Sequence, residues 1–266
     1  MVLSRVLLGG VLLHAVAAAG GLVSAGGSKP LEPAWTVSLQ GGYASTFQLM
    51  LGGTFGGGPD FQNKLTAGIS NLLRNGDSLS LYGWSTTDLP SVSPNWQAGF
   101  SYKERILHKG RHAVVLGGGA QRWLFPDVKT GSNDWLATGT VNYATSVKHV
   151  PITVTSDSFS LLSSPLPPGS LLYTQIQTQH PLLKRGRYQL SLRHGPMHTY
   201  SWGFWGANGN RVVRYGVMLA VVRNNMTIEV GCRQQFGLQD KIPYNRFWTV
   251  LVSRQLSGRF HTNNDR

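Results

Sequence analysis

Apolar and polar residues alternate over most of this 266-residue chain, and this period of two limits the fold more than any other feature. Residues 212–237 read as two alternating runs joined by an Asn-Asn turn. Successive side chains of a β-strand point to opposite faces, so the two runs predict a hairpin with one apolar and one polar face. The apolar face carries Val213, Tyr215, Val217, Leu219, Val221, Met226, Ile228, Val230 and Cys232. The polar face carries Arg214, Gly216, Thr227, Glu229, Gly231 and Arg233.

Similar runs recur from Trp35 to Phe260, and clusters of turn-forming residues separate them. Residues 45–55 read as one such run, whereas residues 206–210, with the sequence GANGN, read as a turn. No sustained helical period follows Pro33, and we expect about twelve strands, within a range of roughly ten to fourteen. Without a helical crossover, these strands are expected to form an antiparallel meander in one all-β domain over residues 26–260.

The apolar faces of these strands can look either at a protein core or at lipid. Many runs are long enough to cross a bilayer when tilted, whereas strands of soluble proteins are usually shorter. A ring of strands also has no open edge, as lipid requires. We therefore expect a closed antiparallel transmembrane β-barrel, and a secreted soluble β-sandwich that binds carbohydrate is an alternative. Interfacial girdles need amphipathic rings near the strand ends, where the sequence places Trp35, Phe55, Trp84, Trp96, Trp123, Phe125, Trp135, Tyr143, Tyr200, Trp202, Trp205 and Trp248.

The composition excludes some classes of protein. The formal charge is +13, yet only 13% of residues are charged and the mean hydropathy is −0.12. That hydropathy excludes a bundle of transmembrane helices but not a barrel, whose lumen-facing residues are polar. Lys and Arg are scattered instead of clustered, so no nucleic-acid partner is expected. The single Cys232 allows no internal disulfide and reads as a small hydrophobic residue on an apolar face.

The N-terminus has the pattern of a secretory signal peptide. A short segment with Arg5 precedes an apolar stretch that ends in small residues. We expect residues 1–25 to be this peptide and residues 261–266 to be a short tail after the barrel.

The last run, FWTVLVSRQLSGRF, resembles the C-terminal strand of bacterial outer-membrane β-barrels. In that strand a late Phe follows apolar residues at every second position. Arg254 interrupts the apolar series here, through either a bulge or a side chain that reaches the membrane interface. The resemblance implies export to an outer membrane and contact with its assembly machinery. The residues that share this spacing are Trp248, Val250, Val252, Leu256 and Phe260.

If alternation holds, a set of mostly basic side chains faces the lumen, and Glu229 is its clearest acid. Cross-strand pairing of Glu229 with an arginine of its own hairpin is expected. Such a lumen would favour anions, or the charges would form a structural network that fills the barrel. The predicted lumen or binding residues are Lys64, Lys103, Arg105, Arg193, Arg214, Glu229 and Arg233.

Catalysis, metal binding and cofactors are not expected. Some outer-membrane barrel enzymes, phospholipases and lipid A deacylases, use Ser and His on the outer wall. Here His198 and Ser201 have a spacing that would place them on opposite faces of one strand. His108 and His112 flank a turn without a carboxylate and do not make a metal site.

The sequence thus predicts a porin-like channel for small polar or anionic solutes in a Gram-negative-type outer membrane. A barrel hydrolase that acts on lipids is the alternative from another class. Membrane lipid is an expected partner, and the oligomeric state stays open.

Overall fold

The structure is a computed structural model that describes residues 31–46, 58–89, 93–125, 132–239, 242 and 244–260. No helix in this described part is long and apolar enough to cross a membrane. The predicted signal peptide and the predicted tail lie outside it. The described residues form twelve strands, which are β1 (Ala34–Ala44), β2 (Asp60–Ser70), β3 (Asp77–Asp88), β4 (Ser93–Lys109), β5 (His112–Phe125), β6 (Ser132–Val147), β7 (Val150–Ser163), β8 (Ser170–Arg185), β9 (Tyr188–Phe204), β10 (Ala207–Arg223), β11 (Met226–Gly237) and β12 (Asn245–Arg259).

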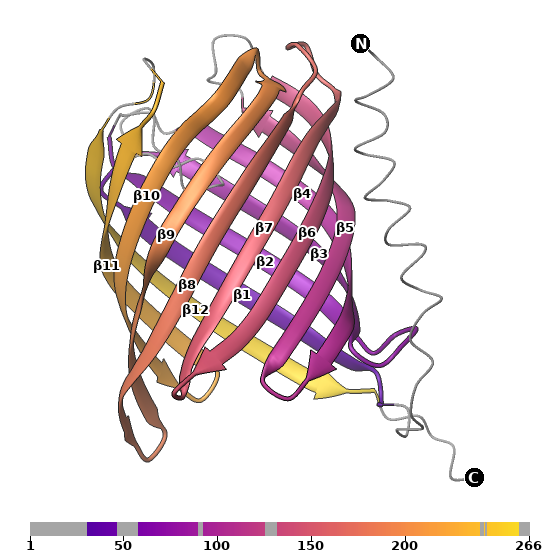
Figure 1. Cartoon of the computed structure of the whole chain (residues 1–266), viewed down its shortest axis with the longest axis vertical. Coiled ribbons are helices and arrows are strands. Elements are labelled where there is room, and N and C mark those ends of the chain that lie inside the picture. The colour runs from indigo at the N-terminus through magenta and orange to yellow at the C-terminus, as the bar shows by residue number, and fades with distance from the viewer. Residues whose placement is uncertain are drawn as a thin grey trace.

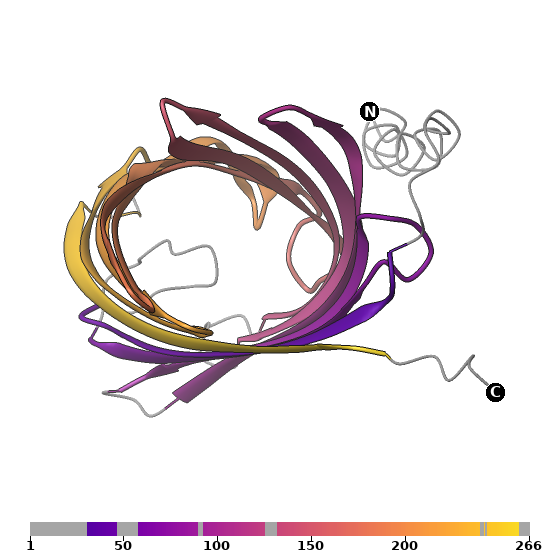
Figure 2. The same ribbon diagram turned by 90° about the horizontal axis from the view of Figure 1, so that it is seen from below.

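The strands close into one barrel in which every strand pairs antiparallel with its neighbours in sequence. The ring is completed where β1 pairs with β12, from Ala34 opposite Arg259 to Ala44 opposite Thr249. Figure 1 shows the strands tilted across the barrel wall, and Figure 2, seen along the barrel, shows the ring. The predicted fold, a closed antiparallel barrel of about twelve strands, is confirmed.

The two ends of the barrel differ in their connections. At one end, which we call the turn end, the connections are residues 71–76, 110–111, 148–149, 186–187 and 224–225. Both chain ends of the barrel, Ala34 and Arg259, lie at this end as well. At the opposite loop end, the connections are residues 45–59, 89–92, 126–131, 164–169, 205–206 and 238–244. The predicted run over residues 45–55 falls here: Ser45 and Thr46 follow β1 as bends, and residues 47–55 lie outside the described part.

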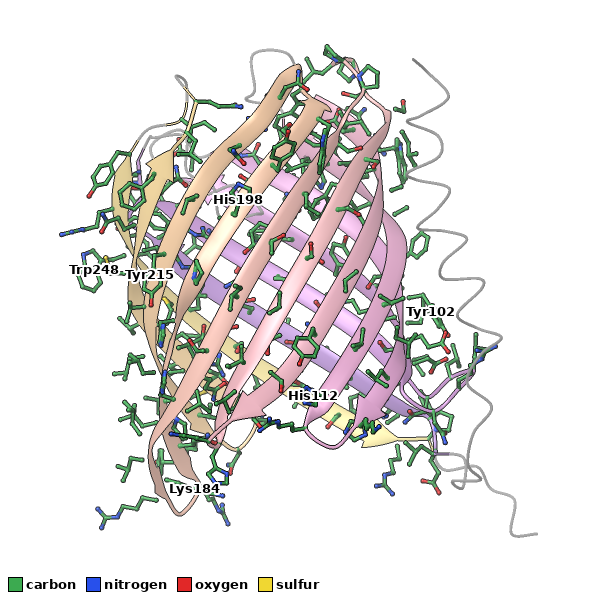
Figure 3. The ribbon with its side chains drawn as sticks, viewed as in Figure 1. Tyr102, His112, Lys184, His198, Tyr215 and Trp248 are labelled. Carbon is green, nitrogen blue, oxygen red and sulfur yellow. The ribbon has the colours of Figure 1, made fainter. Side chains whose placement is uncertain are left out.

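The hairpin of β10 and β11 has the two faces that its sequence predicts. The odd-numbered residues from Val213 to Val221 are 36 to 43% exposed, whereas Arg214 is 5% and Ala220 is 0% exposed. Tyr215 on β10 and Trp248 on β12 project from the outer wall in Figure 3. The apolar face therefore looks outward, and the face with Arg214 looks into the barrel.

The C-terminal strand keeps its register throughout. The β11–β12 pairing runs without a break from Met226 opposite Arg254 to Gln235 opposite Asn245. The bulge explanation for Arg254 is therefore wrong. Arg254 is exposed and lies beside Met226, the first residue after a connection at the turn end. This is the position from which a long cationic side chain reaches an interface.

The β9–β10 connection is not the GANGN turn that the sequence suggests. It consists of Trp205 and Gly206, which have φ values of 52° and 77°, and the remaining residues of GANGN belong to β10. Positive φ at both central residues is the conformation that two-residue hairpin turns need, but it strains a tryptophan. Contacts of the Trp205 ring inside the barrel, described below, offset that strain.

The β2–β3 connection at the turn end is held by the carboxylate of Asp77, which is 1% exposed. The backbone N–H of Leu72 donates to Oδ1 at 2.8 Å, and those of Leu73 and Arg74 donate to Oδ2 at 2.9 and 3.1 Å. The hydroxyl of Tyr102 on β4 also donates to Oδ2, at 3.3 Å. One buried carboxylate thus satisfies three backbone donors of the turn and ties it to a neighbouring strand.

We predict that Asp77→Ala lowers the free energy of unfolding by about 3 kcal/mol, because it leaves several buried donors without an acceptor. Asp77→Asn keeps one acceptor oxygen and serves as the matched control with a smaller loss. Urea unfolding in lipid vesicles, followed by tryptophan fluorescence, measures both. A change below about 0.5 kcal/mol for Asp77→Ala would contradict this role.

Candidate functional site

Three of the predicted lumen cations line one cavity inside the barrel. Lys64 on β2, Arg214 on β10 and Arg233 on β11 border a space of about 200 Å³, together with Tyr173 and Gln175 on β8. Strands β2 and β8 stand on opposite sides of the twelve-stranded ring. The cavity therefore reaches across the lumen, and the strand alternation brings cations from distant parts of the sequence to it.

The two arginines of the cavity lie on the wall formed by β10 and β11. The side-chain stem of Arg233 passes over Gly216, where an added Cβ would lie 3.3 Å from Arg233 Cγ. Tyr173 lies beside both guanidinium groups. Its hydroxyl donates to Gln175 Oε1 at 2.8 Å, so its oxygen can accept from Arg214. Two neighbouring guanidinium groups concentrate positive potential on this side of the lumen.

Lys64 brings a third positive charge from β2, three strands away from β11 around the ring. Its side chain is exposed to the lumen, and its ammonium lies 5.8 Å from the centre of the Tyr82 ring. The Tyr82 hydroxyl donates to Gln121 Oε1 at 2.5 Å, which fixes the ring below the ammonium. Lys103 is close enough to interact electrostatically with Lys64. Strand β2 therefore adds a third cation to the cavity that the two arginines line.

Glu229 pairs with Arg193 on β9 instead of with an arginine of its own hairpin. The strand between them is β10, where Ala220 stands opposite Glu229 on one side and Ser191 on the other. Because Ala220 has only a methyl group, the two long side chains meet across it. The expected pairing within the hairpin is therefore wrong, and the clearest acid of the lumen belongs to a separate ion pair.

Lys103 and Arg105, both on β4, do not line the cavity. Lys103 packs over Gly117 on β5, where a Cβ would lie 2.7 Å from Lys103 Cγ. Arg105 is exposed near the turn end, and its guanidinium lies against Gly76 in the β2–β3 connection. Of the seven predicted residues, three line the cavity, and Arg193 and Glu229 form an ion pair with each other. Lys103 lies near Lys64, and Arg105 lies at the rim.

Asp157 on β7 is a lumen acid that sequence reasoning missed. Its Oδ1 accepts from Thr140 Oγ1 at 2.6 Å, and it is near enough to act electrostatically on Lys64. The sequence signal for an inward Asp157 was its position two residues before Phe159, because residues two apart on a strand share a face. Phe159 is 6% exposed and also points inward. That signal was weak because Ser156 and Ser158 on either side are polar as well, so this part of β7 has no clear apolar face.

An aromatic cluster occupies the lumen toward the loop end. Trp123 and Phe125 on β5, Phe159 on β7 and Phe204 on β9 are buried and in contact. The Trp205 ring lies 5.8 Å from Trp123 and 5.1 Å from Phe204, and its Nε1 donates to Asp134 Oδ2 at 3.1 Å. This cluster fills the side of the lumen formed by β5 to β9, and the cavity opens mainly on the side formed by β1 to β3 and β10 to β12.

This cluster corrects part of the predicted interfacial girdle. Trp123, Phe125 and Trp205 point into the barrel, and Trp84 lines the cavity. Sequence spacing could not separate these rings from lipid-facing ones, because both kinds occur near strand ends. Phe55 lies outside the described residues. Four members of the predicted girdle are exposed as expected, namely Trp96, Trp135, Trp202 and Trp248.

The residues considered for a hydrolase do not form a catalytic pair. His198 lies on the outer wall, where its Nε2 is 2.9 Å from Asn210 Oδ1. Ser201 is 0% exposed on the inner face, and its hydroxyl donates to the backbone oxygen of Ala207. Among the described residues no group of three or more His, Cys, Asp or Glu side chains is arranged to hold a metal ion. His112 Nδ1 instead lies 2.7 Å from the Tyr143 hydroxyl.

No family model and no curated protein sequence matches this chain. Its fold is nevertheless similar to solved outer-membrane barrels. An outer-membrane channel from Pseudomonas putida F1 has a TM-score of 0.53 at 10% identity, over 88% of this chain and 100% of that chain. The NanC porin has a TM-score of 0.50 at 8% identity, over 85% and 100% of the two chains. The translocator domain of autotransporter NalP from Neisseria meningitidis has a TM-score of 0.49 at 10% identity, over 97% of each.

The class of fold that the structure defines is the closed antiparallel β-barrel, which is also the fold of the outer-membrane channel and the NanC porin. At such low identity the likeness extends to the fold and to nothing finer.

We predict that Trp205→Ala lowers the free energy of unfolding by about 3 kcal/mol, because it removes an aromatic ring from a packed cluster together with its bond to Asp134. Trp202→Ala, three residues earlier on the outer wall, is the matched control. Urea unfolding in lipid vesicles compares the two variants. An equal or smaller loss for Trp205→Ala than for Trp202→Ala would show that the lumen cluster does not stabilise the barrel.

Proposed function

We propose that this protein is a porin-like channel that lets small polar solutes pass through the outer membrane and prefers anions. The observation that carries the proposal is the shared cavity of Lys64, Arg214 and Arg233, which β2, β10 and β11 contribute. A cationic constriction with low-dielectric walls raises the local concentration of anions and opposes cations. The uncharged part of the lining, including Gln40, Gln62 and Gln175, supplies hydrogen bonds to a solute that sheds water.

The positive potential of the cavity is only partly balanced by lumen acids. Glu229 is engaged by Arg193, and Asp157 lies on the wall of β7 where Thr140 donates to it. The two cavity arginines lie three and four strands away around the ring, on β10 and β11, and Asp157 acts electrostatically on Lys64. A permeating anion would therefore meet Lys64, Arg214 and Arg233 interspersed with the uncharged amides of the cavity lining.

The same proposal includes where the protein resides. The spacing of the N-terminal residues supports export with removal of residues 1–25, and the C-terminal strand supports insertion by the outer-membrane assembly machinery. In the barrel, the outward residues of β12, such as Val250 and Val252, are suited to lipid. We do not extend the proposal to lipid hydrolysis, because His198 and Ser201 lie on opposite faces of β9.

We predict that single channels in a planar bilayer with a KCl gradient conduct chloride better than potassium. Their reversal potential should therefore have the sign of the chloride equilibrium potential. The Arg214→Gln/Arg233→Gln double variant should lower the chloride-to-potassium permeability ratio on the order of threefold, because it removes two fixed charges from the constriction. The matched control removes the same formal charge from the exposed tip of the β8–β9 hairpin at the turn end, in Lys184→Gln/Arg187→Gln; Lys184 is labelled in Figure 3. That control should retain the wild-type ratio.

The proposal fails if the folded wild-type barrel does not conduct, or if it prefers cations. It also fails if the two double variants change the ratio equally, since the effect would then come from overall charge. Heat-modifiable migration on a gel verifies that each variant is folded before the recording.

A further inference from the structure

Part of the outer wall is polar at the level where lipid is expected. On β7, β8 and β9 the outward positions include two rows of hydrogen-bonding side chains, which we call the outer polar band. One row crosses three strands, with Ser156 paired to Thr174 and Thr174 paired to His198. The second row pairs Thr178 with His194. All of these side chains are partly exposed.

The register places this band within the apolar belt and not at its edge. On the neighbouring strand β10, His198 stands opposite Val213 and His194 stands opposite Val217. Both valines belong to the exposed apolar face of the β10–β11 hairpin. Polar rows directly beside these valines would therefore face acyl chains if nothing else covered them.

The hydroxyls of the band have hydrogen-bonding capacity that their contacts do not exhaust. The His194 ring is already engaged, because its Nδ1 lies 2.7 Å from the Tyr215 hydroxyl and its Nε2 lies 3.0 Å from His180 Nε2. Ser156 Oγ and Thr174 Oγ1 lie 3.2 Å apart, and Thr178 Oγ1 donates to the backbone oxygen of His194 at 2.9 Å. A hydroxyl offers one donor and two acceptor positions, so each contact uses only part of what the group can make. Exposing the remainder to hydrocarbon costs free energy because lipid tails offer no partner.

We propose that the outer polar band is the contact surface between two copies of this chain in the membrane. Only protein can cover the band at this depth and also supply hydrogen bonds. Ser and Thr hydroxyls each donate and accept, so the hydroxyls of Ser156 and Thr174 are complementary to the same pair on a second copy related by a twofold axis. The band contains no Lys, Arg, Asp or Glu, so two chains that each carry a formal charge of +13 meet there without direct repulsion. Ile176, 40% exposed between the two rows, adds an apolar contact.

Cysteine cross-linking tests the proposal, because Cys232 is the only native cysteine and can be removed. Ser156→Cys and Thr174→Cys are introduced separately into the full-length Cys232→Ser chain. The proteins are reconstituted in phosphatidylcholine vesicles at low protein density and treated with a short bis-maleimide. We expect at least one of the two to give most of the chain as a dimer on a denaturing gel. Val230→Cys on β11 and Val250→Cys on β12, exposed outward positions on strands that do not border the band, should stay monomeric.

A second measurement separates a real interface from chance collision. The Ser156→Ala/Thr174→Val variant keeps a folded outer surface of similar shape but removes two hydroxyls. Its dimer fraction, counted by single-molecule photobleaching of labelled barrels, should fall about fivefold or more relative to wild type. The proposal is overturned if neither band cysteine cross-links above the two valine controls, or if the dimer fraction does not change. It is also overturned if cross-linking in native membranes joins the band only to a different protein. None of these outcomes depends on ion conduction.

Discussion

The pairing of β1 with β12 is the interaction on which the rest of the structure depends. It leaves no strand with an unpaired edge, and a sheet without edges is the arrangement that lets a chain of strands reside in hydrocarbon. Closure also separates an inside from an outside. Once that separation exists, the alternation along each strand assigns every side chain either to the outer wall or to the lumen.

The lumen that results is not uniform. Toward the loop end, aromatic side chains of β5 to β9 fill one side, and Trp205 closes the cluster through a strained turn and its bond to Asp134. The other side holds the cavity with Lys64, Arg214 and Arg233. The outer wall is divided in a similar way, because apolar residues cover β10 to β12 and polar rows cross β7 to β9. Selectivity and self-association are therefore proposed for different faces of the same sheet.

Much of this could be predicted from sequence because it follows from a period of two. The faces of β10 and β11 and the inward direction of Arg214 and Arg233 needed only the alternation and the position of the Asn-Asn turn. The partner of Glu229 could not be predicted, since it depends on register with β9 and on the small side chain of Ala220 between the strands. The direction of Trp205 was also hidden, because a tertiary cluster stabilises a backbone conformation that the local sequence disfavours. Asp157 escaped notice because both faces of its strand are polar there.

The most direct test of the central claim is a spin-label scan of residues 212–222 in a Cys232→Ser background, in lipid bilayers. Each position is labelled in turn, and collision with oxygen, which concentrates in lipid, is compared with collision with a water-soluble nickel complex. The account predicts a period of two, in which odd-numbered positions from Val213 to Val221 meet oxygen and even-numbered positions meet the nickel complex. The absence of this alternation, or the reverse assignment of the two faces, would contradict a barrel with lipid outside and a wet, cationic lumen inside.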